Sequence, residues 1–270
     1  DKEINQKIID LYREEGSDAW FKYSKEELLG DKYDPNDYKK VDDILDVWFD
    51  SGCTHSFVLD EKEDQMWPAS LYLEGTDQHR GWFHSSLLES CGTRGIAPYE
   101  SVLTHGFVLH EDGLKMSKSS ANIVSPDEII NKSGADILRL WVASSDYSED
   151  LKIGPEIMKS NVDSYRRLRN TLRFILGNLS EFNDNEKISF VELSELDQYI
   201  LSQLEELKKE VIENYKIFEY QKVFSAIFNF CTNDLSSFYF DIKKDILYCE
   251  SKNSHIRMST RTVLDKLFYN

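Results

Sequence analysis

Two lysines three residues apart, Lys115 and Lys118, stand in the hydroxyl-rich stretch GLKMSKSSAN at residues 113–122. A lysine ammonium is a mobile point charge, serine hydroxyls add hydrogen bonds, and Gly113 lets a ligand approach the backbone closely. Such groups suit a polyphosphate, above all where negative charge grows in a transition state. The stretch is not a Walker loop, because the pattern G-x-x-x-x-G-K-[ST] is absent. Taken alone, it is more often an exposed basic loop than a phosphate site.

Short apolar runs broken by glycines surround this stretch, from about residue 44 to residue 150. They predict strands alternating with helices, and therefore an α/β layer with a largely parallel sheet. Ser125, Pro126 and Glu128 predict a helix start with a capping box. The other predicted elements are a strand at 70–75, a helix at 82–92, a strand or hairpin at 101–110 and a helix at 134–145.

The two flanks differ from this central part. The first residues are charged, with one amphipathic helix, and predict a connecting segment at 1–43 ahead of the α/β domain at 44–154. Residues 155–270 carry apolar side chains at helical spacing and predict an all-α bundle, still helical at its last residues as if more chain followed. An aromatic stripe is expected in the core of this bundle: Phe228, Phe230, Phe238, Tyr239 and Phe240.

Composition describes an ordinary globular chain of 270 residues with 40% hydrophobic and 30% charged residues. No apolar run approaches the roughly 20 residues of a membrane span, and the first residues do not resemble a signal peptide. Four scattered cysteines argue against a zinc ribbon or a disulfide framework and favour a reducing cytoplasm. A net charge of −17 argues against nonspecific nucleic-acid binding, although YRRLRNTLR at 165–173 is either a local basic face or a solvated helix surface.

Residues 115–119 read KMSKS, identical to the signature loop of class I aminoacyl-tRNA synthetases. Ala121 departs from the family, which usually has glycine there. Valyl and leucyl enzymes share the loop but usually not the string EGxDQxRGWF. The whole chain resembles isoleucyl-tRNA synthetases most specifically in four strings: ILDVWFDSG (44–52), YLEGTDQHRGWF (72–83), LTHGF (103–107) and GADILRLWVASSDY (134–147).

The resemblance implies the second half of a Rossmann-like nucleotide-binding domain followed by a helical tRNA-binding domain. It implies activation of isoleucine by ATP and transfer to tRNA(Ile), with magnesium carried by ATP, no protein zinc site and a monomeric cytoplasmic enzyme. By position, Lys115 and Lys118 would stabilise the leaving pyrophosphate. Other matched positions would bind ATP (Ser117, Lys118, Ser119), bind the adenylate (Glu74, Gly75, Asp77, Gln78), border isoleucine (Trp48, Trp82) and support the site (His79, Arg80). The basic run at 165–173 is the candidate tRNA contact, through Arg166, Arg167, Arg169 and Arg173.

The family's second signature, H-I-G-H, and its inserted editing domain do not occur in this sequence. We therefore expect an internal fragment that is inactive by itself. Two alternatives remain open from the residues: a half-synthetase module that binds tRNA or a protein without chemistry, and a fragment of a valyl-type enzyme.

Overall fold

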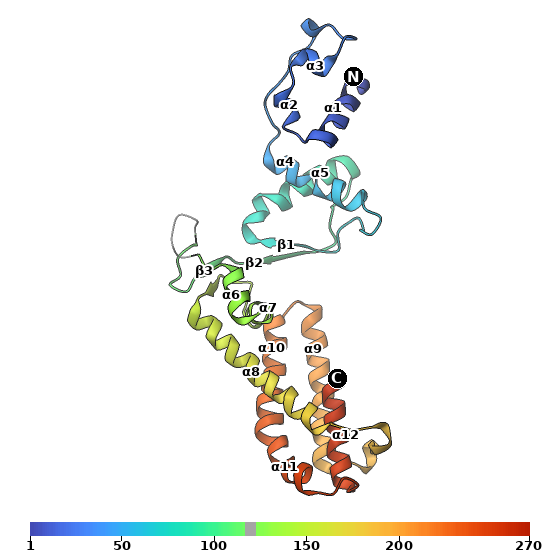
Figure 1. The fold of residues 1–270 in the computed structure, drawn as a ribbon, viewed down its shortest axis with the longest axis vertical. Coiled ribbons are helices and arrows are strands. Elements are labelled where there is room, and N and C mark those ends of the chain that lie inside the picture. The colour runs from blue at the N-terminus through green and yellow to red at the C-terminus, as the bar shows by residue number, and fades with distance from the viewer. Residues whose placement is uncertain (117–122) are drawn as a thin grey trace. The chain divides into compact units, whose positions relative to one another are not determined.

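The computed structural model describes residues 1–116 and 123–270 of the chain (Figure 1). Two compact units divide it: the first comprises residues 1–72 and 77–102, and the second comprises residues 73–76 and 103–270. No helix within the described ranges is long and apolar enough to cross a lipid bilayer.

The first unit begins with α1 (Lys2–Glu15), α2 (Ala19–Lys22), α3 (Lys25–Leu29) and the 3-10 turn η1 (Pro35–Asp37). The predicted amphipathic helix is α1, which Asp1 caps and Gly16 ends with a left-handed φ of 80°. Ser24 and Glu27 form a reciprocal capping box that starts α3. None of the α1 side chains is buried, so the interior of these helices is small.

The same unit continues with α4 (Val47–Gly52), the π-helical turn η2 (His55–Asp60), all but the first residue of the 3-10 turn η3 (Thr76–Arg80), and α5 (Trp82–Arg94). The predicted helix at 82–92 is confirmed as α5, and Gly95 ends it in the left-handed conformation. The DVWFDSG string forms α4, whose first amide protons Asp46 caps by accepting a hydrogen bond from Trp48 N at 2.8 Å.

The strands form two pairs. β1 (Tyr72–Gly75) pairs with β2 (Val102–His105), and β3 (Val108–His110) runs parallel to β4 (Leu151–Ile153) with Leu109 opposite Lys152. The hairpin considered for 101–110 is wrong, because its two strands belong to different pairs. Gly106 lies so close to the backbone that a Cβ there would sit 2.7 Å from Asp150 N, and Phe107 N donates to the Asp150 carboxylate at 2.7 Å. This long-range contact directs the chain from β2 toward β4.

Two helices follow the lysine stretch, α6 (Pro126–Ser133) and α7 (Ala135–Ser144). Ser125 caps α6 as predicted, but it accepts from Asp127 N and not from the Glu128 amide that a capping box uses. A small apolar cluster joins these helices to β4 and α8 through Ile129, Trp141, Ile153 and Met158.

The remainder of the chain is the predicted helical bundle. It contains α8 (Pro155–Asn178), η4 (Asp184–Glu186), η5 (Phe190–Glu192), α9 (Glu195–Lys216), α10 (Tyr220–Asn229), the π-helix η6 (Phe230–Tyr239), α11 (Phe240–Cys249) and α12 (His255–Tyr269). Of the aromatic stripe, Phe230, Tyr239 and Phe240 are buried, whereas Phe238 is 44% exposed. The prediction that Phe238 lies in the core is therefore wrong.

A buried carboxylate ties four of these helical segments, α9, η6, α11 and α12, together. Asp197 on α9 accepts hydrogen bonds from the Tyr239 hydroxyl at 2.6 Å and the Lys243 ammonium at 2.9 Å through Oδ1. Through Oδ2 it accepts from Ser194 at 2.8 Å and Ser259 at 2.7 Å. Burial alone would raise the pKa of Asp197, but these hydrogen bonds outweigh it and lower the pKa.

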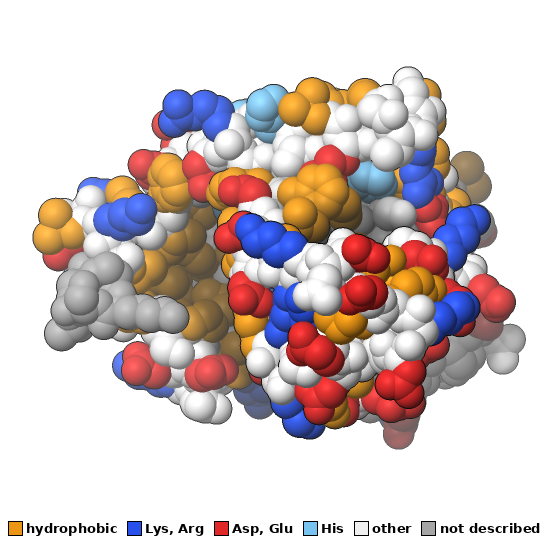
Figure 2. Space-filling view, turned by 90° about the horizontal axis from the view of Figure 1, so that it is seen from above, with side chains coloured by type: hydrophobic (Ala, Val, Ile, Leu, Met, Phe, Trp, Pro, Cys, Tyr) orange, Lys and Arg blue, Asp and Glu red, His pale blue; other side chains and the backbone are white. Residues whose placement is uncertain are grey.

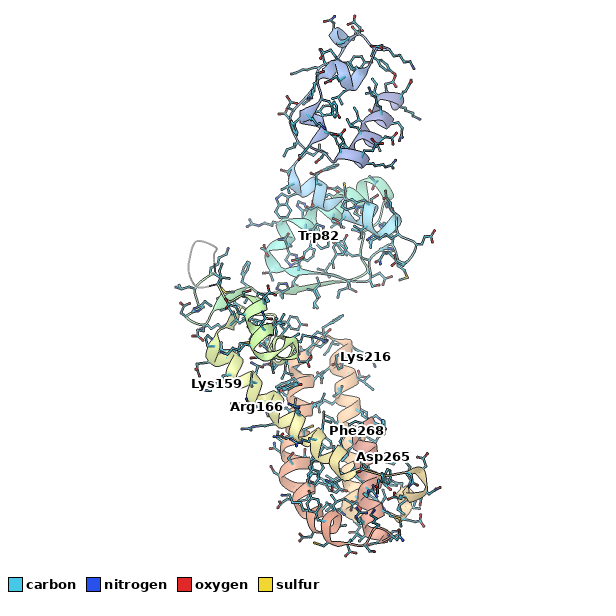
Figure 3. All side chains as sticks on the ribbon, in the orientation of Figure 1. Trp82, Lys159, Arg166, Lys216, Asp265 and Phe268 are labelled. Atoms are coloured by element: carbon cyan, nitrogen blue, oxygen red, sulfur yellow. The ribbon has the colours of Figure 1, made fainter. Side chains whose placement is uncertain are left out.

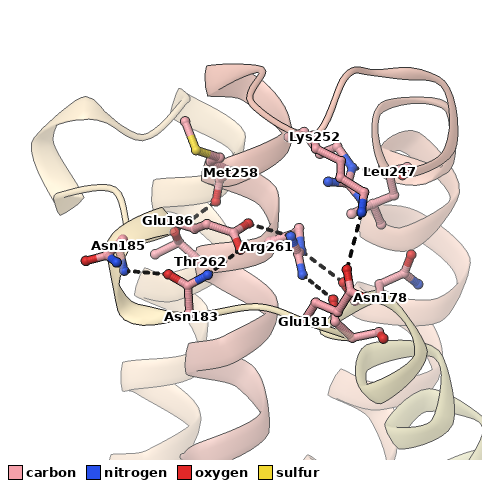
Figure 4. Close-up of polar contacts among 12 residues, drawn as sticks. Asn178, Glu181, Asn183, Asn185, Glu186, Leu247, Lys252, Met258, Arg261 and Thr262 are labelled. Carbon is pink, nitrogen blue, oxygen red and sulfur yellow. Dashed lines mark hydrogen bonds and ion pairs between the residues drawn. The ribbon is translucent and has the colours of Figure 1, made fainter.

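The middle of α12 is buried on every side, from residue 259 to residue 264. Its one charged member, Arg261, donates to the carbonyl oxygens of Asn178 at 3.1 Å and Ser180 at 2.7 Å and pairs with Glu186 (Figure 4). The guanidinium thereby satisfies carbonyl groups at and beyond the end of α8, where a helix has no internal donors.

Candidate active site

The Trp82 side chain is fixed from two directions at the start of α5 (Figure 3). Its ring stacks on Tyr72, with centroids 4.2 Å apart and an interplanar angle of 5°. Its Nε1 donates to the carbonyl oxygen of Ser51 at 2.9 Å. Tyr72 is in turn buried, and its hydroxyl lies 3.0 Å from Ser86 Oγ. Stacking plus a directed hydrogen bond gives the indole one orientation.

Trp48 lies against the same end of α5. Gly81 is buried there, and a Cβ at this position would sit 2.9 Å from Cη2 of Trp48. The missing side chain at Gly81 is therefore what lets the Trp48 ring approach. Because Trp48 is 45% exposed, part of its flat surface stays available to a ligand. The structure thus brings together both tryptophans predicted to border isoleucine.

Gln78 joins this cluster. Its Oε1 accepts from Trp82 N at 3.0 Å, and its Nε2 donates to the Asp77 carboxylate at 3.1 Å. The amide therefore satisfies an otherwise free N–H at the start of α5 and orients the exposed carboxylate of Asp77. His79 and Arg80 are exposed on η3, and the His79 ring meets Phe83 edge-on at 5.7 Å.

Glu74 and Gly75 lie at the end of β1, in the second unit. Glu74 is exposed and Gly75 is buried. Glu74 is therefore not a buried structural carboxylate at this strand end. An exposed carboxylate keeps its acceptor oxygens available to hydroxyl or amino groups.

A tight hairpin presents Lys115, also in the second unit. Lys115 and Leu109 form an isolated antiparallel β-bridge, and His110 N donates to Leu114 O at 3.0 Å. Gly113 adopts the positive φ of 84° that the turn between them requires. Asp112 accepts from Leu114 N at 2.9 Å, and this hydrogen bond lowers the pKa of Asp112. Burial opposes the effect, and a hydrogen bond with His110 adds to it. The exposed Lys115 ammonium lies over the Phe107 ring at 5.7 Å. The other predicted members of the loop, Ser117, Lys118 and Ser119, lie outside the described residues, as does Ala121.

The four predicted tRNA-binding arginines, Arg166, Arg167, Arg169 and Arg173, are all exposed on α8. Arg166 pairs with Asp163 at 3.3 Å, one turn earlier on the helix. Within the described ranges, the other three have no carboxylate within 4.0 Å. The charge of these three arginines is thus available to an anion. The view from above in Figure 2 shows acidic and basic side chains beside one another on the surface.

Metal-ligating side chains are dispersed. In residues 1–116 and 123–270, no three His, Cys, Asp or Glu side chains are grouped closely enough to hold a metal ion. Burial raises the pKa of Cys231 to about 11, so its thiol stays protonated at neutral pH.

Sequence reasoning missed three participants in this site: Tyr72, Ser51 and Gly81. Gly81 carries a sequence signal, since a glycine directly before two aromatic residues at a helix start indicates close packing. The stacking of Tyr72 on Trp82 and the carbonyl contact of Ser51 depend on how β1, α4 and α5 pack, and the sequence has no signal for them.

The fold and these motifs define a class of protein. Residues 1–154 match the family described as tRNA synthetases class I (I, L, M and V), and residues 197–270 match the anticodon-binding domain of tRNA ligases. The chain belongs to the class I tRNA synthetases. Its relatives include the isoleucine–tRNA ligase of Pelagibacter ubique, 56% identical over 98% of this chain and 30% of that protein. The isoleucine–tRNA ligase of Ruegeria pomeroyi is 53% identical over 100% of this chain and 28% of that protein.

The chain thus spans less than a third of the length of these curated relatives. Solved structures share its fold at lower identity. A leucyl enzyme of Agrobacterium radiobacter K84 in complex with tRNA superposes with a TM-score of 0.66 at 16% identity, over 83% of this chain and 29% of that one. Methionyl-tRNA synthetase of Mycobacterium tuberculosis bound to methionyl-adenylate superposes with a TM-score of 0.58 at 21% identity, over 78% of this chain and 42% of that one. The resemblance stated from the motifs is confirmed at the level of the family.

Proposed function

We propose that this chain is the part of an isoleucine–tRNA ligase that carries the second half of the catalytic domain and the first tRNA-binding helices. The observation that carries this proposal is the match of nearly the whole chain, at 48–56% identity, to proteins named isoleucine–tRNA ligase. In the proposed reaction, the isoleucine carboxylate attacks the α-phosphate of ATP and displaces pyrophosphate. The isoleucyl group of the adenylate then passes to the terminal ribose of tRNA(Ile) in the cytoplasm, and AMP leaves.

Lys115 and Lys118 have the proposed role of stabilising negative charge on the departing pyrophosphate. Ser117 and Ser119 would add hydrogen bonds to ATP, and magnesium would arrive with the nucleotide and not at a dedicated protein site. The exposed position of Lys115 at the end of a fixed hairpin supports this role. Catalysis would rest on positioning and on phosphate electrostatics, without a covalent enzyme intermediate.

Glu74, Gly75, Asp77 and Gln78 have the proposed role of lining the adenylate site. The exposed carboxylates of Glu74 and Asp77 can accept hydrogen bonds from ribose hydroxyls or from the amino group of isoleucine. Trp48 and Trp82 would border the aliphatic side chain. Their fixed flat rings support this assignment, because rigid apolar walls bury a branched chain at little entropic cost.

The proposed tRNA contact is the arginine face of α8. Exposed guanidinium groups bind phosphate oxygens in a bidentate manner. The availability of Arg167, Arg169 and Arg173 supports a phosphate contact within a chain of net charge −17.

Isoleucine-dependent ATP–pyrophosphate exchange tests the proposal, using the full-length polypeptide that contains this chain. We expect exchange with isoleucine to exceed exchange with valine, and Lys115→Ala and Lys118→Ala each to lower kcat by about 10²–10³, the loss typical of one transition-state donor. The chain of 270 residues alone should show no exchange. Preference for valine would indicate a valyl-type enzyme. Binding of tRNA without any exchange by the full-length polypeptide would indicate a binding module.

A further inference from the structure

Three consecutive residues at the end of α4 lie against α5. The Ser51 carbonyl accepts from Trp82, as described above. The next residue, Gly52, is buried beneath the Glu89 carboxylate, and a Cβ at Gly52 would sit 2.7 Å from Cδ of Glu89. Trp82 and Glu89 are seven positions apart, two turns of α5, and therefore lie on the same face. The end of α4 is thus held at two points along one face of α5.

The third residue, Cys53, also faces Glu89. Burial, followed by the neighbouring Glu89 carboxylate, raises the pKa of the Cys53 thiol to about 11. At neutral pH this thiol keeps its proton and can donate to a carboxylate. Oε2 of Glu89 is buried and has no hydrogen-bond partner in the described part of the chain. A buried acceptor next to a protonated thiol favours their approach, because an unmet carboxylate oxygen is costly.

His55 completes the surroundings of Glu89. It is 3% exposed, and both of its ring nitrogens lack a partner within the described residues. Burial, and then the positive charge of Arg94, lower the pKa of His55, which is therefore neutral at pH 7. Arg94 itself is held by Asp60, at 3.1 Å between Nη1 and Oδ1, and by stacking on Trp67 at 4.5 Å. Arg94 is therefore committed to a different carboxylate, and the contacts described for Glu89 are those with the end of α4.

We propose that Glu89 is a positioning residue that fixes α4 along α5 and thereby places Trp48 against Gly81 and Trp82. The inference rests on the proposed function and deepens it: the width of the isoleucine pocket is set by a carboxylate two helical turns away from the pocket wall. Glu89 touches neither substrate in this proposal. It acts through Gly52 and Cys53, and these act through the three residues of α4, 49–51, that separate Gly52 from Trp48.

Pyrophosphate exchange by the full-length polypeptide tests the inference through the two KM values. Glu89→Ala should raise the KM for isoleucine about tenfold and leave the KM for ATP unchanged, since a loosened pocket wall weakens binding of the amino acid alone. Glu89→Gln keeps the size of the side chain and its hydrogen bonding, and should stay within about twofold of the parent. Glu100→Ala, which removes an exposed glutamate of the same unit, is the matched control.

Gly52→Ala provides the reciprocal test. Its new methyl group displaces the Glu89 carboxylate, so it should raise the KM for isoleucine as Glu89→Ala does. In the Glu89→Ala background the methyl group has room, and it should add no further change. Equal and additive effects of the two substitutions would overturn the inference. So would a Glu89→Ala enzyme with reduced kcat and both KM values unchanged, which is the result of lost folded protein alone.

A second readout does not depend on catalysis. The difference in tryptophan emission between the chain and its Trp48→Phe variant isolates the signal of Trp48. Glu89→Ala and Gly52→Ala should shift this signal, whereas Glu89→Gln and Glu100→Ala should not. An unshifted Trp48 signal in Glu89→Ala would overturn the inference, whatever the exchange assay shows. Lack of isoleucine-dependent exchange by the full-length polypeptide would instead refute only the proposed function. Should Glu89→Ala not fold, Gly52→Ala carries both readouts.

Discussion

The core of the helical region, residues 155–270, and the start of the motif-bearing region, residues 44–154, differ in how far they bury their apolar side chains. In the helical region Ile200, Val263 and Leu264 are completely buried, and the buried ion pair of Asp197 has every acceptor position filled. In the motif-bearing region Ile44 is 83% exposed and Val47 is 69% exposed.

The helical region buries these apolar side chains within the chain itself, whereas residues 44–49 leave theirs exposed. Contiguous exposed apolar side chains mark surfaces that other protein covers. The exposed run at 44–49 precedes and includes the proposed pocket wall, which agrees with the proposal that further polypeptide completes the catalytic domain. If this difference is real, substitutions in the two regions should change the free energy of unfolding by very different amounts.

The largest effect is expected at Asp197. Asp197→Ala leaves the Lys243 ammonium buried without its counter-charge, and breaking a buried pair in this way costs about 3–5 kcal/mol. Urea unfolding of the chain, followed by the helical circular dichroism signal, measures this loss. Asp241→Ala, which removes an exposed partner of Lys244, is the control and should cost less than about 0.5 kcal/mol. Equal effects of the two substitutions would mean that the buried pair does not stabilise the bundle.

Truncating apolar side chains compares the two regions directly. Ile200→Ala should cost about 2–5 kcal/mol, because it removes completely buried methyl groups and leaves a cavity. Val47→Ala should stay within about 0.5 kcal/mol, since the side chain is largely in water. Both free energies of unfolding come from the same urea titration. A large loss for Val47→Ala would show that the chain covers residues 44–49 by itself.

A drop in pH should lower the free energy of unfolding in the two regions at different pH values, by less than the substitutions above. The pKa of His55 is lowered below its ordinary value of 6.5, so the unfolded chain binds this proton more readily than the folded chain. The free energy of unfolding around α4 and α5 therefore falls as the pH drops below about 6.5. The pKa of Asp197 is lowered below its ordinary value of 3.8, so its contribution is lost only when the pH falls below about 3.8.

Hydrogen-exchange protection factors at about pH 7.5 and about pH 5 resolve the two regions segment by segment. Peptides from α4 and α5 should lose protection at the lower pH, and peptides from α9 and α12 should not. His55 faces Arg94, Glu89 and Asp60, and His55→Gln should remove most of the difference. A pH response that persists in His55→Gln would assign it to those neighbours.

The smallest effect on stability is expected on the arginine face of α8. Arg173→Ala should change the free energy of unfolding by less than about 0.5 kcal/mol, because its side chain is exposed. The affinity of the Arg173→Ala protein for tRNA should fall, and the slope of the logarithm of its affinity against the logarithm of the salt concentration should decrease in magnitude by about 1. Filter binding over a salt series measures both quantities. The control is Lys222→Ala, which removes an exposed lysine at the start of α10 that pairs with Glu219. It should leave the slope unchanged.

Local patterns predicted much of the fold. The helices α7 and α9 follow from apolar spacing, and the start of α6 follows from Ser125 and Pro126. The helix α5 was predicted from its place after the strand at 70–75. The fate of residues 101–110 could not be predicted, because the contact that separates its two strands joins Phe107 to Asp150, 43 positions away. Phe238 was misplaced for a related reason. The π-helix η6 winds more widely than an α-helix, so the face that its residues occupy departs from the α-helical periodicity.

The candidate site shows the same division. Motifs identified Trp48 and Trp82, and the structure places them together at one end of α5. The contacts that orient them have no such signal: Tyr72 lies in a motif that does not reveal its stacking on Trp82, and Glu89, the proposed positioning residue, lies outside the motifs, because both roles depend on which faces of β1, α4 and α5 meet. Such contacts follow from packing and not from spacing along the chain.

The consecutive contacts of residues 51–53 with α5 also determine where the chain can change in length. One residue inserted between Trp48 and Ser51 would turn the indole about 100° away from Gly81, because each helical position rotates by that angle. Residues 61–66, which follow η2, are all exposed and can absorb additional residues without moving α4. Among proteins of this family, insertions should therefore accumulate after η2, and the spacing from Trp48 to Gly52 should stay constant.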